Sequence, residues 1–270
     1  MFYLTHTPWW LKKIYPTCIW DIPVTGKTIF LTFDDGPHET ATPFVLQQLE
    51  LYKAKATFFC IGKNVAEHPE ILKQIKADGH AVANHTMHHT NGCKTNDDAY
   101  LKEIADADAL IGSTLFRPPY GRIKRSQILK IQGSRNKGQG TRNKDQDSSF
   151  KDQGSGSKDQ ESKSANQTSD IRHQTSEIKV QESRSANQTI DIRDQKFEII
   201  MWSVLSGDFD TEIDGEKCFQ NVIRKIKPGS IIVFHDSRKA LPRLQYALPK
   251  LLRWMQENGY VSEAIGVSVS

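Results

Sequence analysis

Short apolar or β-branched runs alternate along this chain with longer segments whose apolar residues recur every three or four positions. Such alternation is typical of parallel strands joined by right-handed helical crossovers, in a barrel or in an open doubly wound sheet. The expected strands are residues 28–33, 56–61, 80–84, 115–117, 197–204, 230–234 and 260–265. The expected helices are residues 42–53, 69–78, 95–111, 122–131, 215–226 and 240–258. Seven strands predict an α/β fold, an incomplete or distorted (β/α)7 barrel.

Residues 133–195 interrupt this alternation with nine consecutive heptads, each of which ends in Gln. Only eight of these 63 residues are apolar, so the segment cannot bury enough surface to offset the entropy of ordering it. The fourth heptad position offers no continuous apolar seam for a coiled coil. We therefore expect a disordered low-complexity insertion. The rest divides into an aromatic-rich segment, 1–27, packed on the domain, and one domain formed by 28–132 and 196–270.

The overall composition argues against some classes of function. The 270 residues carry 36 Lys and Arg against 32 Asp and Glu, and this net charge of +4 is too small to indicate a nucleic-acid partner. The first 20 residues contain no unbroken apolar stretch, so we expect neither a signal peptide nor a transmembrane segment. The four cysteines show no CxxC spacing, which favours reduced thiols and a cytoplasmic location. The sequence leaves the oligomeric state open.

Aromatic side chains are concentrated at the beginning of the chain. They are Phe2, Tyr3, Trp9, Trp10, Tyr15 and Trp20. Such residues could lie at a membrane interface. Because aromatic rings bury large areas, we expect them to pack against the domain instead.

Two polar clusters come directly after expected strands, at residues 34–37 (DDGP) and 85–89 (HTMHH). His85 and His89 are four residues apart and can face one metal ion, while a carboxylate completes a facial triad with positions left open. Either cluster alone would indicate an ordinary polar turn. Together, at two strand ends, they indicate a metal site.

These clusters resemble the first two motifs of the polysaccharide deacetylase family, the NodB homology domain of carbohydrate esterases. Residues 117–120 (RPPY), 202–208 (WSVLSGD) and 233–236 (VFHD) resemble its third, fourth and fifth motifs, in the same order. The resemblance spans about residues 28–265 apart from the heptads. Phe209 stands where the family often has Trp, and Val233 where Leu is frequent, which affects the shape of the pocket more than its chemistry.

The resemblance implies a role for each matching residue. Asp35, His85 and His89 are expected to hold a divalent metal, commonly zinc, with cobalt or nickel also accepted. Asp34 is expected to act as the general base that takes a proton from the attacking water. His235 is expected to act as the general acid that protonates the leaving amine.

Further roles follow from the same resemblance. Arg117 is expected to orient Asp34, and Asp208 to hold His235 and favour its protonated form. The backbone N–H of Tyr120 is expected to stabilise the tetrahedral oxyanion together with the metal. The pocket for the acetyl methyl group is expected to be lined by Trp202, Val233 and Pro118.

Some of these residues also have plainer interpretations. His88 is out of register with the two histidine ligands, so we expect it beside the site or at the surface. Arg117 could belong to an ordinary ion pair, and Trp202 to the core. Asp236 could be a simple loop residue.

The sequence thus predicts a metal-dependent hydrolase that removes acetyl groups from N-acetylated amino sugars, with an N-acetylated carbohydrate as its partner. O-Deacetylation, or hydrolysis of a cyclic amide, remains open because the core of the site does not fix the leaving group. A sugar-binding module with a decayed site is the non-enzymatic alternative. The sequence does not select among peptidoglycan, chitin fragments, a lipid-linked sugar and a smaller substrate.

Overall fold

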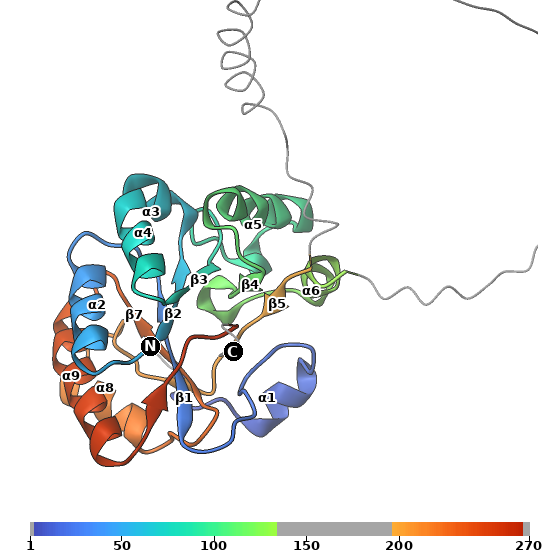
Figure 1. Ribbon diagram of the computed structural model, residues 1–270. Helices are drawn as coiled ribbons and strands as arrows, with labels where there is room; N and C mark the ends of the chain where they lie inside the picture. Colours follow the sequence, from blue (N-terminus) through green and yellow to red (C-terminus); the bar gives the residue numbers. More distant parts are fainter. Residues whose placement is uncertain (1–2, 134–195, 267–270) are drawn as a thin grey trace, which may run out of the picture. The chain divides into compact units, whose positions relative to one another are not determined.

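The computed structural model describes residues 3–133 and 196–266 of the chain (Figure 1). The expected disordered insertion therefore lies, apart from Gly133, outside the described residues. The strands form one curled parallel sheet in the order β5-β4-β3-β2-β1-β7-β6, with β8 paired to the start of β1. Their bounds are β1 Thr28–Asp34, β2 Ala56–Cys60, β3 Ala81–Asn84, β4 Leu115–Phe116, β5 Glu198–Ile199, β6 Val204–Leu205, β7 Ile231–His235 and β8 Val261–Ser262. The predicted distorted (β/α)7 barrel is confirmed.

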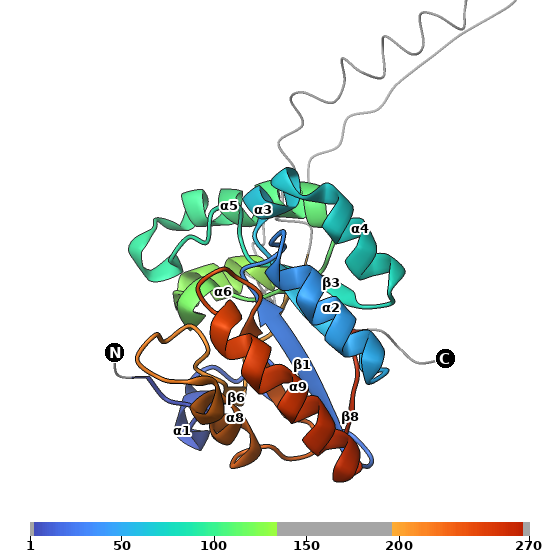
Figure 2. The ribbon, with the colours of Figure 1, turned by 90° about the vertical axis from the view of Figure 1, so that its left-hand side faces the viewer.

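Helices cover the outside of this sheet. Figure 2 shows α2 and α9 lying across one side of β1. The helix bounds are α1 Trp9–Ile14, α2 Ala41–Leu51, α3 Gly62–Glu67, α4 Pro69–Ala77, α5 Asp97–Ile111, α6 Arg125–Ile131, α8 Gly215–Ile223 and α9 Leu241–Glu257, with 3₁₀ turns at Gly92–Lys94 and Pro119–Gly121. Among the described residues, no helix combines the length and the apolar character needed to cross a bilayer.

Local sequence signals explain where several helices begin and end. The side chain of Asn96 accepts a hydrogen bond from the Ala99 N–H (2.9 Å) and caps α5, which ends at Gly112 in the left-handed region (φ 67°). Asp214 caps α8 by accepting from the Lys217 N–H at 2.7 Å. The helices α1 and α3, six residues each, were not expected, because so short a segment gives no helical period to detect.

The central strand β1 separates the hydrophobic core from the barrel interior. Ile29, Leu31 and Phe33 are buried in a cluster that also contains residues of α2 and α9. Successive side chains of a strand point to opposite faces, so Thr32 and Asp34 point into the barrel. The alternation that builds the core therefore also delivers a carboxylate to the carboxyl end of the sheet.

The expected strand at 197–204 is two short strands, β5 and β6, with residues 200–203 between them. The carbonyl oxygens of Ile200 and Met201 accept hydrogen bonds from the guanidinium of Arg117, at 3.1 and 3.0 Å. These two acceptors serve a buried side chain instead of a strand ladder, which a pattern of apolar residues cannot reveal. The expected strand at 260–265 is also shorter, and as a strand it pairs with the beginning of β1.

The N-terminal segment spans the two ends of the strand order. Ile19 accepts a backbone hydrogen bond from the Met201 N–H (2.7 Å), just after β5. Thr5 accepts one from the Leu205 N–H of β6 (3.0 Å). Residues before the first expected strand therefore complete the wall of the barrel where β5 and β6 do not pair with each other.

The two ends of the described chain that flank the insertion lie next to each other. The Phe197 N–H donates to the Ile131 carbonyl oxygen at 3.2 Å, and a Cβ placed on Gly133 would lie 3.4 Å from the Lys196 side chain. Gly133, assigned to the insertion from sequence, instead follows the end of α6 in the left-handed region (φ 72°). Both ends lie before β5, away from the carboxyl ends of the strands.

We predict that replacing residues 134–195 by Gly-Ser leaves the fold intact. Loop-closure entropy favours the shorter connection by about 0.6 kcal/mol for each halving of the loop length. The melting temperature, followed by circular dichroism, should therefore equal that of the full chain or exceed it by a few degrees. Variants lacking two, four and six heptads are the controls and should fall between these limits. A drop of more than about 5 °C would contradict the prediction.

Candidate active site

Asp34 and Asp35 serve one site although neighbouring residues of a regular strand point apart. Asp34 is the last residue of β1. Asp35 leaves the strand in the left-handed region, at φ 82°, which breaks the strand alternation. Both carboxylates therefore reach the carboxyl edge of the sheet, where His85 and His89 follow β3.

Asp236, treated from sequence as a possible loop residue, fixes this turn from the end of β7. Its carboxylate is fully buried and accepts from the Gly36 N–H (3.0 Å) and the Thr42 hydroxyl (2.5 Å). A Cβ on Gly36 would lie 2.1 Å from Asp236 Oδ2, so only glycine fits there. Burial raises the pKa of the Asp236 carboxyl to about 8, with a further contribution from Asp35.

Asp35, His85 and His89 form a group with metal-binding geometry. One ligand atom from each residue lies within 4.8 Å of the others. Asp35 Oδ1 is 3.2 Å from His89 Nε2 and 3.8 Å from His85 Nε2. Among the described residues, this buried oxygen has no hydrogen-bond partner. An unpartnered buried carboxylate oxygen that faces two imidazole nitrogens is what a divalent metal would satisfy, so these residues fit the predicted ion.

Both histidines are oriented by their second ring nitrogen. His85 Nδ1 donates to the Arg117 carbonyl oxygen at 2.8 Å, and His89 Nδ1 lies 3.1 Å from the Tyr120 hydroxyl. Burial, helped by the neighbouring His89, lowers the pKa of His85 to about 3. His85 is therefore neutral at physiological pH, which is the ligating form of imidazole, and its Nε2 is directed at Asp35.

Arg117 is fully buried and pairs with Asp34 at 2.6 Å. The same Nη1 also donates to the Thr32 hydroxyl at 2.7 Å, and the guanidinium lies 3.9 Å from the centroid of the Phe59 ring. Burial lowers the pKa of Arg117, while Asp34 opposes this shift. Asp34 thus accepts from one nitrogen of a guanidinium whose other nitrogens donate to the carbonyl oxygens of Ile200 and Met201.

His235 ends β7 directly beside Asp34, its register partner in β1. The Asp208 carboxylate accepts from His235 Nδ1 and from the His235 backbone N–H, both at 2.7 Å. Burial alone would lower the pKa of His235, but the charge and hydrogen bond of Asp208 outweigh it and raise the pKa to about 10. The imidazole is therefore cationic at neutral pH and able to donate a proton from Nε2.

The remaining predicted residues surround this centre at different depths. Tyr120 is exposed, and its ring centroid lies 4.5 Å from that of His89. Trp202 contacts two hydrophobic clusters and lies over the Arg117 guanidinium, 5.8 Å from ring centroid to carbon. Pro118 is buried, and Val233, two residues before His235, is buried on the same face of β7. His88 lies outside the metal group and pairs with Glu103 at 3.0 Å.

Strained backbone is concentrated at the same place. Of the five described non-glycine residues with positive φ, four belong to the motif turns: Asp35, Thr86, His89 and Tyr120. Such conformations cost free energy and persist where the surroundings enforce them. In these turns the left-handed backbone directs side chains such as Asp35 and His89 toward the site, which a regular strand would not do.

Sequence reasoning missed residues that support the site from a distance. The Tyr3 ring packs on Phe209 (5.0 Å between centroids), and Phe209 lies edge-on to His235 (5.2 Å). Thr32 links Arg117 to the Ile232 carbonyl oxygen, 2.8 Å from its hydroxyl. Of these residues, Thr32 has a sequence signal, because it is a polar residue inside the apolar run of residues 29–33. Nothing in the sequence connects Tyr3 with a motif two hundred positions away.

Known proteins that are similar in sequence to this chain are deacetylases. Residues 21–134 match the polysaccharide deacetylase family. A peptidoglycan-N-acetylglucosamine deacetylase of Bacillus cereus is 41% identical over 119 residues, which cover 42% of this chain and 56% of that protein. A chitooligosaccharide deacetylase of Rhizobium leguminosarum bv. trifolii is 36% identical over 99 residues, covering 37% and 46% respectively. The match thus spans about half the length of these relatives.

The fold of the described residues also agrees with that of a solved structure. A crystal structure of the peptidoglycan N-acetylglucosamine deacetylase Bc1960 superposes with a TM-score of 0.66, covering 96% of this chain and 95% of that one at 24% identity. The sequence match covers the first two motifs and the third, and the shared fold extends to the strands that carry the fourth and fifth. Residues 21–134 thus resemble the polysaccharide deacetylase family in sequence, and the fold of the chain resembles that of a solved peptidoglycan N-acetylglucosamine deacetylase.

Proposed function

We propose that this protein is a metal-dependent hydrolase that removes the acetyl group from N-acetylated amino sugars, with residues 28–132 and 196–270 as its catalytic domain. The observation that carries the proposal is a carboxylate and an imidazole, each bound to a buried partner, beside one metal-binding group. Asp34 is paired with a buried arginine, and His235 is held protonated by Asp208. An amide hydrolase needs a base and an acid of this kind.

Asp35, His85 and His89 would hold the ion, and zinc suits one carboxylate and two neutral imidazoles, with cobalt or nickel as alternatives. When bound, such an ion supplies Lewis acidity, which polarises a carbonyl and lowers the pKa of water. Asp34 takes a proton from the attacking water, and His235 passes one to the leaving nitrogen. The Tyr120 backbone N–H donates to the developing oxyanion. The acetyl methyl group is received by Trp202, Val233 and Pro118.

The raised pKa of His235 favours an amide over an ester as the bond that is cleaved. An amine anion is a far poorer leaving group than an alkoxide, so amide cleavage depends more on a proton delivered to the leaving atom. A histidine with a pKa of about 10 stays protonated throughout the neutral range. O-Deacetylation by the same site is the alternative.

The names of the relatives suggest the substrate class. They act on N-acetylglucosamine units of peptidoglycan or on chitooligosaccharides. We propose a polymer or oligomer of N-acetylglucosamine for this chain. Release of acetate from chitin oligomers and peptidoglycan, compared with an O-acetylated sugar, tests this choice. Acetate released only from the O-acetylated sugar would reject it, and binding without any acetate release would favour a decayed sugar-binding module.

The metal group gives a prediction that does not depend on turnover. Replacing Asp35, His85 or His89 by Ala should lower zinc affinity by more than about 100-fold, since each substitution removes a ligand. Zinc retained after dialysis against a chelator, measured by mass spectrometry, reports the loss. His88→Ala is the matched control and should keep its zinc, because His88 is 58% exposed and pairs with Glu103. Stoichiometric zinc in the His85→Ala, His89→Ala double variant would contradict the assignment.

Asp34→Asn should separate metal binding from proton transfer. The amide oxygen can still accept from Arg117, so the fold and the zinc content should be preserved. Because an amide is not a base, kcat/KM on a chitin oligomer should fall by about 100-fold or more. The melting temperature and zinc content control for structural damage. Nearly full activity in a folded, metal-loaded Asp34→Asn variant would remove Asp34 from the base role.

Asp208→Asn should shift the pH profile of the reaction in a defined direction. His235 must be protonated to act as an acid, so activity falls as the pH rises through its pKa. Loss of the Asp208 charge lowers this pKa, because burial is then the dominant influence. The alkaline limb of kcat/KM should move to lower pH by more than about one unit. An unchanged limb in a folded variant would show that another group controls it.

A further inference from the structure

The outer face of α1 carries two tryptophans that do not pack on the domain. Trp9 and Trp10 are 69% and 48% exposed, and Ile14 is 41% exposed. Positions 9, 10, 13 and 14 lie on one side of a helical turn, so these side chains share a face with Lys13. Trp20, by contrast, is only 6% exposed.

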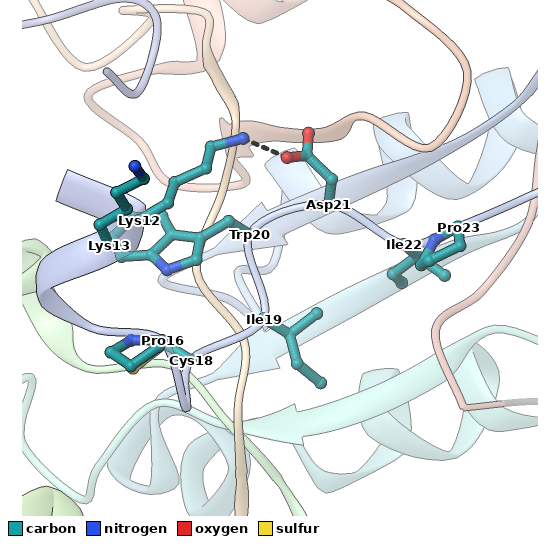
Figure 3. Close-up of a pocket in the computed structure, with 9 residues that line it drawn as sticks. All are labelled: Lys12, Lys13, Pro16, Cys18, Ile19, Trp20, Asp21, Ile22 and Pro23. Carbon is teal, nitrogen blue, oxygen red and sulfur yellow. Dashed lines mark hydrogen bonds and ion pairs between the residues drawn. The ribbon is translucent and has the colours of Figure 1, made fainter. Parts of the chain in front are cut away.

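The orientation of α1 is fixed by its other side. Leu11 packs against the hydrophobic cluster that contains Trp20. Lys12 reaches across the hollow between α1 and the following segment to pair with Asp21 (Figure 3). The exposed apolar face is therefore a stable feature of the folded domain rather than a consequence of a loose terminus.

The charged residues of α1 itself are cationic. Helix α1 contains no acidic residue, and Lys13 Nζ lies 4.9 Å above the Trp9 ring. His6 lies three residues before α1, and burial lowers the pKa of its imidazole. The nearby charges of Lys225, Lys12 and Lys227 lower this pKa further. Lys13, Lys225 and Lys227 are themselves exposed. The apolar face thus carries the exposed Lys13 against Trp9, and α1 places no acidic residue beside it.

We propose that this face of α1 docks on an anionic lipid bilayer, with the tryptophans and Ile14 among the headgroups and the lysines against lipid phosphates. Tryptophan and lysine both have an apolar body and a polar end, which suits the boundary between acyl chains and water. A helix of six residues is far too short to span a membrane, so it lies flat on the surface.

Charge decides between this partner and two others. A neutral glycan would stack on the tryptophans but would gain nothing from the surrounding lysines. A second copy of the chain would bring two groups of lysines together, which is unfavourable. An anionic bilayer uses both the apolar face and its cationic surroundings.

Vesicle co-sedimentation of the full chain tests the proposal without reference to catalysis. Binding to phosphatidylcholine vesicles containing 30% phosphatidylglycerol is expected in the wild type, with weak binding to phosphatidylcholine alone. Trp9→Ala with Trp10→Ala should lower the affinity by about tenfold or more. Lys13→Gln, Lys225→Gln and Lys227→Gln should each lower it by up to about fivefold, and added salt should weaken it further.

The matched control removes exposed leucines from other helices. Leu51→Ala with Leu129→Ala, at residues 70% and 61% exposed, should leave vesicle binding unchanged. Equal binding by the wild type and the tryptophan variant, or equal loss in the leucine control, would overturn the proposal. It would also be overturned if the tryptophan variant lost only chitin or peptidoglycan binding, or only a dimer seen by gel filtration. A blue shift of tryptophan emission on vesicle addition, absent in the variant, would support it.

Discussion

The buried guanidinium of Arg117 connects more of this structure than any other described side chain of the site. It donates to Thr32 and Asp34 of β1 and to the carbonyl oxygens of Ile200 and Met201. Its own backbone donates to Asn84 of β3 and accepts from His85. A charge removed from water costs several kcal/mol unless it is paired, and here each partner belongs to the site or to the wall around it. The position of the Asp34 carboxylate and the closure of the barrel therefore depend on one residue.

The pairing of β1 with β7 joins two halves of the site that lie far apart in the sequence. The family match ends at residue 134 and includes Asp34, Arg117 and the group formed by Asp35, His85 and His89. His235 and its partner Asp208 follow after residue 204. Asp34 and His235 become neighbours because they occupy the same level of adjacent parallel strands. A shift of this register by one residue would turn one of them away from the site.

Long periodic segments and contiguous motifs could be predicted from sequence, and features that depend on distant contacts could not. All seven expected strands begin within one residue of an observed strand, because buried parallel strands give clear apolar runs. The strand is interrupted at 200–203 because the carbonyl oxygens of Ile200 and Met201 bind the Arg117 guanidinium. Asp236 supports the site through a hydrogen bond from Gly36, which lies 200 positions earlier. The metal group was found because two of its members share one turn. The ring contacts from Tyr3 through Phe209 to His235 join distant segments, so no local sequence pattern predicts them.

Gly133 and Lys196, the described residues that flank the insertion, lie next to each other. They precede β5 and lie at the opposite end of the strands from His235. A connection whose ends already touch imposes no span that the intervening residues must bridge. Its length can change by whole heptads without moving a strand, so gain or loss of repeat units in the gene is structurally neutral for the barrel. The same geometry makes this junction a permissive site at which an unrelated domain or a reporter could be inserted without reaching the catalytic edge.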